Sequence, residues 1–139
     1  MRYMMIMRST PEAQEAAKDV PFDEILTAMG KYNESLIEAG VMLAGEGLAE
    51  PEEGFVVDFS SDRPAVSDKP YGAKDLFNGF WIIGVSSKEE ARQWASRCPL
   101  GPGATLEVRR VHEIDELPQD NAYVQKEIHW RRDAEAANK

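Results

Sequence analysis

The sequence is poor in the residues that most often build disulfides and metal sites. It has a single cysteine, Cys98, and two histidines, His112 and His129. One cysteine cannot form a disulfide within the chain, which fits a reducing compartment. The two histidines lack the spacing and the cysteine partners of a metal site. We therefore expect no metal and no cofactor, and a cytoplasmic protein.

Long apolar runs and basic clusters are also missing. The apolar start from Met1 to Met7 is too short for a signal sequence or a membrane span, and Arg8 and Pro11 end it. The chain carries 25 acidic and 16 basic residues, a formal net charge of −9. A protein that grips nucleic acid neutralises phosphates with a basic patch, which this sequence lacks. We expect neither a nucleic-acid partner nor a membrane.

The residues that are present predict one domain of alternating strands and helices. At 139 residues with 42% hydrophobic content the chain can bury a core. A helix is expected between Pro21 and Gly40, with an apolar face made of Phe22, Ile25, Leu26, Met29, Tyr32, Leu36 and Ile37. A second helix should begin at the Ser87 cap and end at Pro99, and a weakly amphipathic third should follow Pro118.

The same patterns predict the strands. Four are expected for the main sheet, over about 2–7, 41–44, 79–85 and 105–111, with residues 45–48 closing the second. Residues 55–59 and 64–67 should form a hairpin arm, whereas residues 9–18 are expected to be a polar loop. Residues 1–117 would form the domain and residues 118–139 a helical tail that docks on the body or on a partner.

The order β-α-β, inserted hairpin, β-α-β predicts an α+β fold of the ferredoxin-like type, with an antiparallel sheet and both helices on one face. The central strands, such as residues 80–85, are apolar on both faces. A large apolar face is seldom left in water. We therefore expect a homodimer in which a second copy covers the sheet.

Several short motifs, in this order and spacing, resemble one family. They are Arg2-Tyr3-Met4, Ala39-Gly40-Val41, Gly45-Glu46-Gly47-Leu48, Asp68-x-Pro70-Tyr71, Lys74-Asp75, Gly79-Phe80, Glu89-Glu90-Ala91 and Glu107-Val108-Arg109. Over Met1 to about Leu117 the chain resembles the YCII-related proteins of the DGPF type, although Lys69 and Tyr71 replace the glycine and phenylalanine of that signature. The resemblance implies a dimeric α+β barrel. Many family members are uncharacterised, some are linked to sigma-factor systems, and a few resemble small-molecule lyases or isomerases.

Three residues around the loops after the second strand and the hairpin are candidates for chemistry. Glu46, between two glycines, could be a carboxylate in a pocket that transfers a proton, or a turn residue that accepts nearby amide hydrogens. Asp68 could form a turn or hold a pocket mouth together with Lys74. Lys74 in turn could bind an anion, donate a proton or make an exposed ion pair.

A second group of candidates lies on the first and last strands and the first helix. Glu107 and Arg109 alternate on one side of the last strand, so Arg109 could bind a substrate carboxylate or either residue could form an ion pair. His112 is a candidate acid or base. Tyr3 and Tyr32 could supply hydroxyls to the same pocket or fill the core. Cys98 is interpreted as a core residue.

Two functions fit these residues. The first is a cofactor-independent enzyme, or a binder, that acts on a small organic acid; Glu46, Asp68 or His112 would transfer protons, and Arg109 or Lys74 would anchor the acid. The second is a non-catalytic regulatory or interaction module that serves a transcription-factor partner. A shared enclosed cavity would favour the first, whereas side chains that point separately into solvent would count against it.

Overall fold

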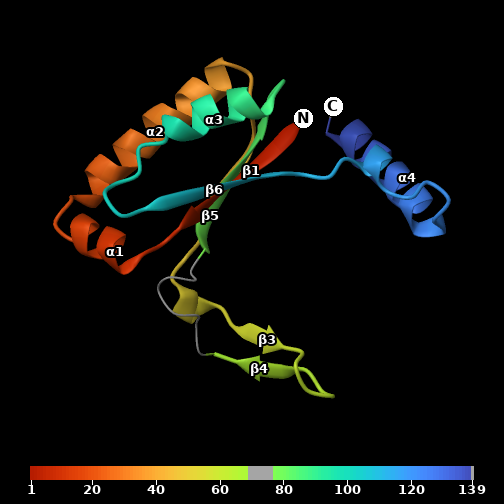
Figure 1. The fold of residues 1–139 in the computed structure, drawn as a ribbon, viewed down its shortest axis with the longest axis horizontal. Helices are drawn as coiled ribbons and strands as arrows, with labels where there is room; N and C mark the ends of the chain where they lie inside the picture. The colour runs from red at the N-terminus through yellow and green to blue at the C-terminus, as the bar shows by residue number, and fades with distance from the viewer. Residues whose placement is uncertain (69–76, 139) are drawn as a thin grey trace.

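A four-stranded antiparallel sheet forms the centre of the protein (Figure 1). The computed structural model describes residues 1–68 and 77–138. The strands are β1 (Arg2–Arg8), β2 (Met42–Gly47), β5 (Phe77–Gly84) and β6 (Thr105–Arg110), in the order β2-β5-β1-β6. This order, with a helix between β1 and β2 and another between β5 and β6, is the predicted ferredoxin-like arrangement.

Two helices cover one face of this sheet (Figure 1). They are α2 (Phe22–Glu38) and α3 (Lys88–Ser96). Gly40, with a φ of 73°, turns the chain directly after α2, which a residue with a side chain would do only under strain. The Ser87 hydroxyl accepts the backbone N–H of Glu90 at 3.0 Å and so caps α3 as predicted.

The core lies between the two helices and the central strands. Met5 of β1 pairs with Trp81 of β5, and both side chains are buried. Tyr32 of α2 meets the Trp81 ring edge to face at a centroid distance of 5.6 Å. The Trp81 indole N–H donates to Asn33 at 2.8 Å, so the polar atom of this large ring is satisfied. Ile83 and Leu36 complete the fully buried centre.

The segment expected to be a polar loop contains a short helix, α1 (Pro11–Ala17). The Thr10 hydroxyl accepts the backbone N–H of Ala13 at 3.0 Å, and Pro11 occupies the first helical turn. A threonine cap followed by proline starts a helix even without apolar periodicity. The prediction of a loop was therefore wrong, because α1 has no buried residue and no apolar face to reveal it.

The buried face of α2 is narrower than predicted. Tyr32 and Leu36 are buried and Met29 packs against the core. Phe22, Leu26 and Ile37 are 70%, 53% and 64% exposed, so they do not belong to the core of this chain. Helical spacing groups residues on one side but does not show how wide a stripe the sheet covers.

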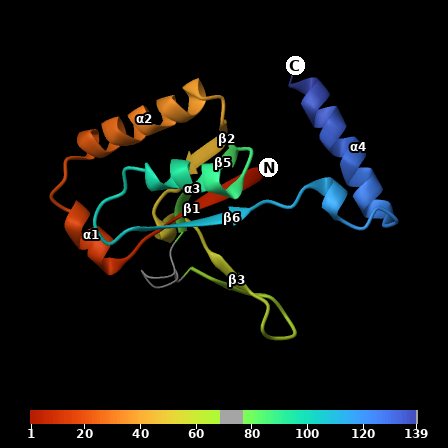
Figure 2. The same ribbon diagram turned by 45° about the horizontal axis from the view of Figure 1, so that its top comes forward.

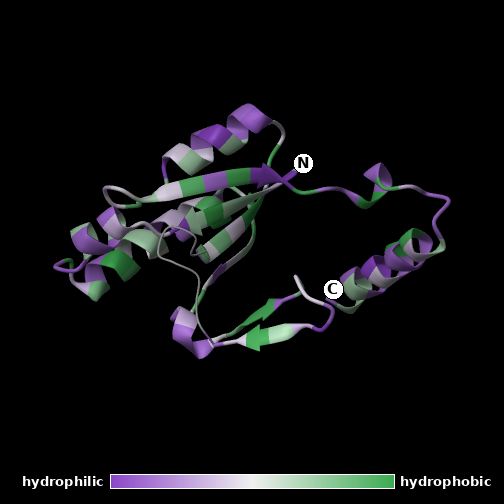
Figure 3. Ribbon diagram, turned by 60° about the horizontal axis from the view of Figure 1, so that its bottom comes forward, coloured by the Kyte–Doolittle hydropathy of each residue, from purple (hydrophilic) through white to green (hydrophobic). Residues whose placement is uncertain are grey.

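Two segments extend from this body (Figures 1 and 2). The predicted hairpin is β3 (Val56–Asp58) paired with β4 (Ala65–Ser67), preceded by the short helix η1 (Pro51–Glu53). It carries hydrophobic residues although it leaves the sheet (Figure 3): Phe55, Phe59 and Val66 are each at least 68% exposed.

The second segment is the C-terminal helix α4 (Ala122–Ala137). Its main contact is with the short helix η3 (Ile114–Glu116) rather than with the sheet or the other helices. Ion pairs from Arg2 to Glu113 at 3.0 Å and from Arg110 to Glu116 at 2.8 Å fix this connection to the sheet. Among the described helices none is long and apolar enough to cross a bilayer.

Leu36 and its neighbour Ile37 give a direct test of which side of α2 is buried. We expect Leu36→Ala to lower the free energy of unfolding by about 2–5 kcal/mol, because its side chain is fully enclosed. Ile37→Ala should cost under about 1 kcal/mol, since that side chain is mostly exposed. Urea denaturation of the two variants measures both values, and equal losses would contradict the packing described here.

Candidate functional site

Three of the sequence candidates lie on the sheet face opposite the helices. Two cross-strand rows run over this face. One contains Glu46, Phe80, Ile6 and Glu107, and the next contains Ala44, Ile82, Met4 and Arg109. Glu46 stands on edge strand β2 and Arg109 on edge strand β6, roughly 14 Å apart at about 4.8 Å per strand. One chain alone therefore does not bring them into a common pocket.

Glu46 also differs from its prediction in its local structure. It lies within β2, opposite Phe80, and not in a turn past the end of a strand. Glycines are uncommon inside strands, so Gly45 and Gly47 made the sequence pattern predict that the second strand ends at residue 44, whereas β2 continues to Gly47. Gly45 is required by packing, because a Cβ there would lie 3.0 Å from the Trp81 ring.

The remaining loop candidates are separated from one another. Asp68 is exposed after the end of β4, and Lys74 lies outside the described residues. The side chain of His112 is 76% exposed beyond β6, with Nδ1 3.8 Å from a carboxylate oxygen of Glu116. The roles proposed for these residues stay predictions.

The two tyrosines occupy different surroundings. The Tyr32 hydroxyl donates to the backbone oxygen of Trp94 at 2.8 Å inside the core, and burial raises its pKa. Tyr32 therefore links α2 to α3. Tyr3 is buried on the helix side of the sheet, where it lines a cleft beside α3.

A cavity of about 560 Å³ lies where α1 and α2 meet the end of the sheet. This volume falls within the range of small-molecule sites in proteins. Most of the wall is apolar and comes from Met7, Ala13, Ala16, Ala17, Val20, Ile25, Ala28, Met29, Pro99, Leu100, Pro102 and Ala104. Arg8, Ser9, Gln14, Glu24 and Asn78 add the polar groups.

The polar residues of this cavity have unused hydrogen-bonding capacity. Ser9 is 5% exposed and its hydroxyl accepts the Gln14 amide at 3.1 Å, but it donates to no described residue. Arg8 is among the described residues of the lining, but its guanidinium is paired at 3.3 Å with Glu107 on the sheet face opposite the helices. Glu24 is the only acid among the described lining residues and makes no ion pair within the described chain. A hydroxyl, two amides and one carboxylate thus border a mostly apolar cavity that is open to solvent on one side.

Helix α1 is held over this cavity by the loop before β6. The Thr10 hydroxyl donates to the backbone oxygen of Gly103 at 2.6 Å. Gly103 adopts a φ of 83°, and a Cβ there would lie 2.7 Å from the Cβ of Glu12. Only glycine allows this approach, so the loop and α1 form a fixed wall.

Sequence reasoning missed this cavity for identifiable reasons. Glu24 lies in the first turn of α2, where acidic residues are explained by the helix dipole alone. Ser9 and Gln14 fell in a segment predicted to be a loop. The pattern Thr10-Pro11-Glu12 could have revealed α1, but no pattern in the sequence shows that α1 and α2 enclose a space beside β1.

Cys98 packs against the core, as predicted. Burial raises its pKa to about 11, so little of the thiol ionises near neutrality. We expect it to react with iodoacetamide at pH 8 at least ten-fold more slowly than glutathione, and to react faster as the pH rises toward 11. Mass spectrometry at timed intervals measures this rate. A reaction as fast as that of glutathione would contradict the burial described here.

Comparison with known proteins identifies the family of this chain. The model of the YCII-related domain matches residues 1–115, and the chain therefore belongs to that family. Among curated proteins no sequence match is found. One similar solved structure is 5-chloro-2-hydroxyhydroquinone dehydrochlorinase (TftG) from Burkholderia phenoliruptrix AC1100, in complex with 2,5-dihydroxybenzoquinone. The identity is 14% and the TM-score 0.40, over 81% of this chain and 96% of that one.

Proposed function

We propose that the protein binds a small organic acid in the cavity beneath α1 and α2 and acts on it without a cofactor. The observation that carries this proposal is the composition of the wall. Among the described lining residues, Glu24 is the only acid, and it stands with the Ser9 hydroxyl and the Gln14 and Asn78 amides in a mostly apolar cavity. Apolar pockets with a few convergent polar groups are typical small-molecule sites.

The chemistry of the lining supports a division of roles. The Gln14 and Asn78 amides line the cavity and can donate to a carboxylate. The apolar body of the acid would pack against residues such as Ile25, Met29 and Leu100. Ser9 can donate to a further oxygen.

Glu24 supplies the proton transfer in this proposal. Its carboxylate would take a proton from a carbon of the bound acid, and the C–H electron pair would form a C=C bond to the neighbouring carbon. In an isomerase an existing C=C bond of the acid shifts by one position at the same time, and Glu24 returns the proton to the carbon at its far end. In a lyase the neighbouring carbon loses a leaving group, which departs with the electrons of the broken bond. Neither reaction needs an oxidant or a reductant.

Substitutions at Ser9 and Glu24 test the proposal. A panel of small carboxylates should contain acids that raise the melting temperature of the wild type, since a ligand at 100 times its Kd stabilises by about 2.7 kcal/mol. Ser9→Ala should reduce that shift, because the carboxylate loses the hydroxyl that donates to it. Glu24→Gln should keep the shift and abolish turnover of the same acid.

Two matched variants serve as controls. Ser35→Ala makes the same change as Ser9→Ala outside the cavity and should keep the shift. Glu34→Gln makes the same change as Glu24→Gln on the outer side of α2 and should leave turnover intact. If no acid in the panel raises the melting temperature, the proposal is wrong and the interaction-module hypothesis gains.

We also propose that a second copy covers the sheet face opposite the helices and completes a dimeric α+β barrel. Met4, Ile6, Phe80 and Ile82 form an apolar centre on this face. Charges stand at its edges, with Glu46 on one side and Arg109 on the other. Strand β6 also carries Glu107, which is paired with Arg8, so Arg109 remains to pair with Glu46 of a two-fold related copy across the interface.

Ile82→Glu tests the dimer. A carboxylate in the apolar centre would be buried without a partner, so we expect a monomer at micromolar concentration. Light scattering measures the mass, and Phe22→Glu, an equivalent change at an exposed position on the helix side, should leave the dimer intact. A wild-type protein that is itself monomeric would contradict the proposal.

A further inference from the structure

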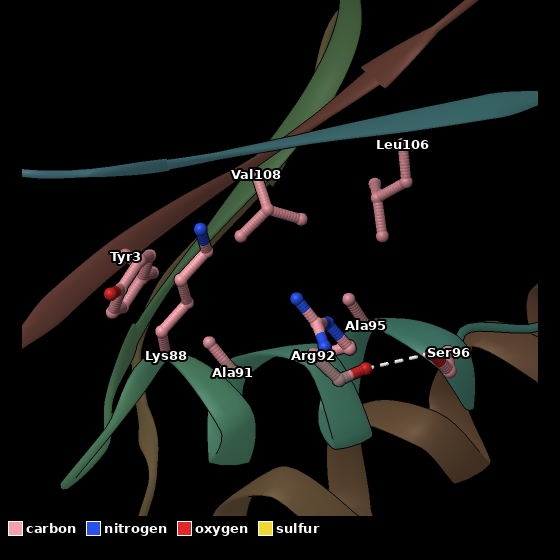
Figure 4. Close-up of a pocket in the computed structure, with 8 residues that line it drawn as sticks. All are labelled: Tyr3, Lys88, Ala91, Arg92, Ala95, Ser96, Leu106 and Val108. Carbon is pink, nitrogen blue, oxygen red and sulfur yellow. Dashed lines mark hydrogen bonds between the residues drawn. The ribbon is translucent and has the colours of Figure 1, made fainter.

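A second space, partly open to solvent, lies on the same side of the sheet but beside α3. It is a cleft of about 340 Å³ between α3 and edge strand β6, and it shares no described lining residue with the cavity under α1 and α2. Figure 4 shows Leu106 and Val108 extending from β6 toward α3. Ala91 and Ala95 form the opposite wall, and their small side chains leave the space open. The walls are therefore aliphatic.

Two cations from α3 reach over this aliphatic surface. Lys88 and Arg92 are four residues apart and so lie on the same side of the helix. In Figure 4 both extend across the gap toward β6. Lys88 makes no ion pair within the described chain, and Arg92 makes one exposed contact, with Glu89 at 3.2 Å. Both cations therefore have donors left for an anion.

Helix stability does not explain the lysine. Lys88 is the first residue of α3, where the partial positive charge of the helix end disfavours a cation. Glu89 and Glu90 fit that position and Lys88 does not. The helix terminus and Lys88 thus both place positive charge at this end of the cleft, next to the carboxylates of Glu89 and Glu90.

Tyr3 provides an independent polar group. It is 6% exposed, lines the cleft, and its hydroxyl makes no hydrogen bond with any described residue. Within the described chain no fully buried side-chain oxygen or nitrogen lacks a partner, so the Tyr3 hydroxyl is accessible. A buried tyrosine normally satisfies its hydroxyl, and this one is left available for a ligand.

We propose that the α3–β6 cleft binds an aliphatic carboxylate, separately from the acid in the α1–α2 cavity. The carboxylate contacts Lys88 and Arg92 and the aliphatic chain lies against Leu106 and Val108. The Tyr3 hydroxyl donates to a carboxylate oxygen. Charge and aliphatic contact are both needed, because neither exposed cations nor a shallow apolar wall alone binds a small molecule selectively.

Octanoate is the probe, and amide NMR spectra of the ¹⁵N-labelled full chain are the measurement. We expect octanoate to shift amide signals within residues 88–96 and 105–110. Lys88→Gln and Arg92→Gln should each raise its Kd about ten-fold, the loss expected for one charge-assisted hydrogen bond. Octan-1-ol, which has the same chain without the charge, should bind at least about ten-fold more weakly.

Two control variants separate binding in the cleft from a general attraction of the anion to basic side chains. Lys126→Gln on α4 makes the same change of charge outside the cleft and should leave the Kd unchanged. Equal weakening by Lys126→Gln would overturn the proposal, because it would show attraction to the whole chain. The spectrum of each free variant shows whether it is folded, and Arg92→Lys, which keeps the charge, should bind more tightly than Arg92→Gln.

The site of the shifts distinguishes this proposal from the proposed function. Octanoate-induced shifts confined to residues 13–29 would contradict the proposed site in the cleft and place the acid in the α1–α2 cavity. Shifts confined to α3 and β6 that persist in Ser9→Ala support the cleft, whether or not the cavity binds any acid. If octanoate shifts no amide signal in the spectrum, the proposed site in the cleft is also contradicted.

Discussion

The pairing of β1 with β5 is the constraint on which the other elements depend. Both strands have neighbours on each side, so their backbone groups are satisfied within the sheet. Met5, Trp81 and Ile83 turn toward the helices and are buried there, while Ile6 is buried on the opposite face. The helices pack on this pair through Leu36 and through Tyr32, whose hydroxyl reaches the backbone of α3. These buried side chains fill the centre of the helix side.

The two described cavities lie where the helices diverge from the central pair. At the α1–α2 end and along the α3–β6 edge, alanines face the sheet instead of larger side chains, and both cavities are lined by them. Charged and hydroxyl groups with donors or acceptors to spare also gather there, because a charge near the central pair would be buried without water. Because the middle of the domain is filled by packed side chains, both cavities and their polar groups lie at its periphery.

Local sequence rules predicted the elements that carry their own pattern. Gly40, the Ser87 cap and the apolar run at residues 80–83 predicted α2, α3 and β5 close to where they lie. The rules failed where the pattern is weak, or where buried and exposed residues show the same pattern. Helix α1 has a cap but no apolar face, and Glu46 lies in a part of β2 that was not predicted because glycines flank it. Phe22 has helical spacing yet is exposed.

The sequence by itself therefore determined the order of the elements, the ferredoxin-like plan and the family, because capping, periodicity and motif spacing act over a few residues. Only the tertiary structure decided which side chains share a space. Ser9 and Glu24 come from different segments that meet beside α1, and Lys88 faces Val108 across a gap between a helix and a strand. Which side chains become neighbours depends on how the helices lie over the sheet. That arrangement is set by the packing of Leu36, Tyr32 and Trp81 and not by any local pattern.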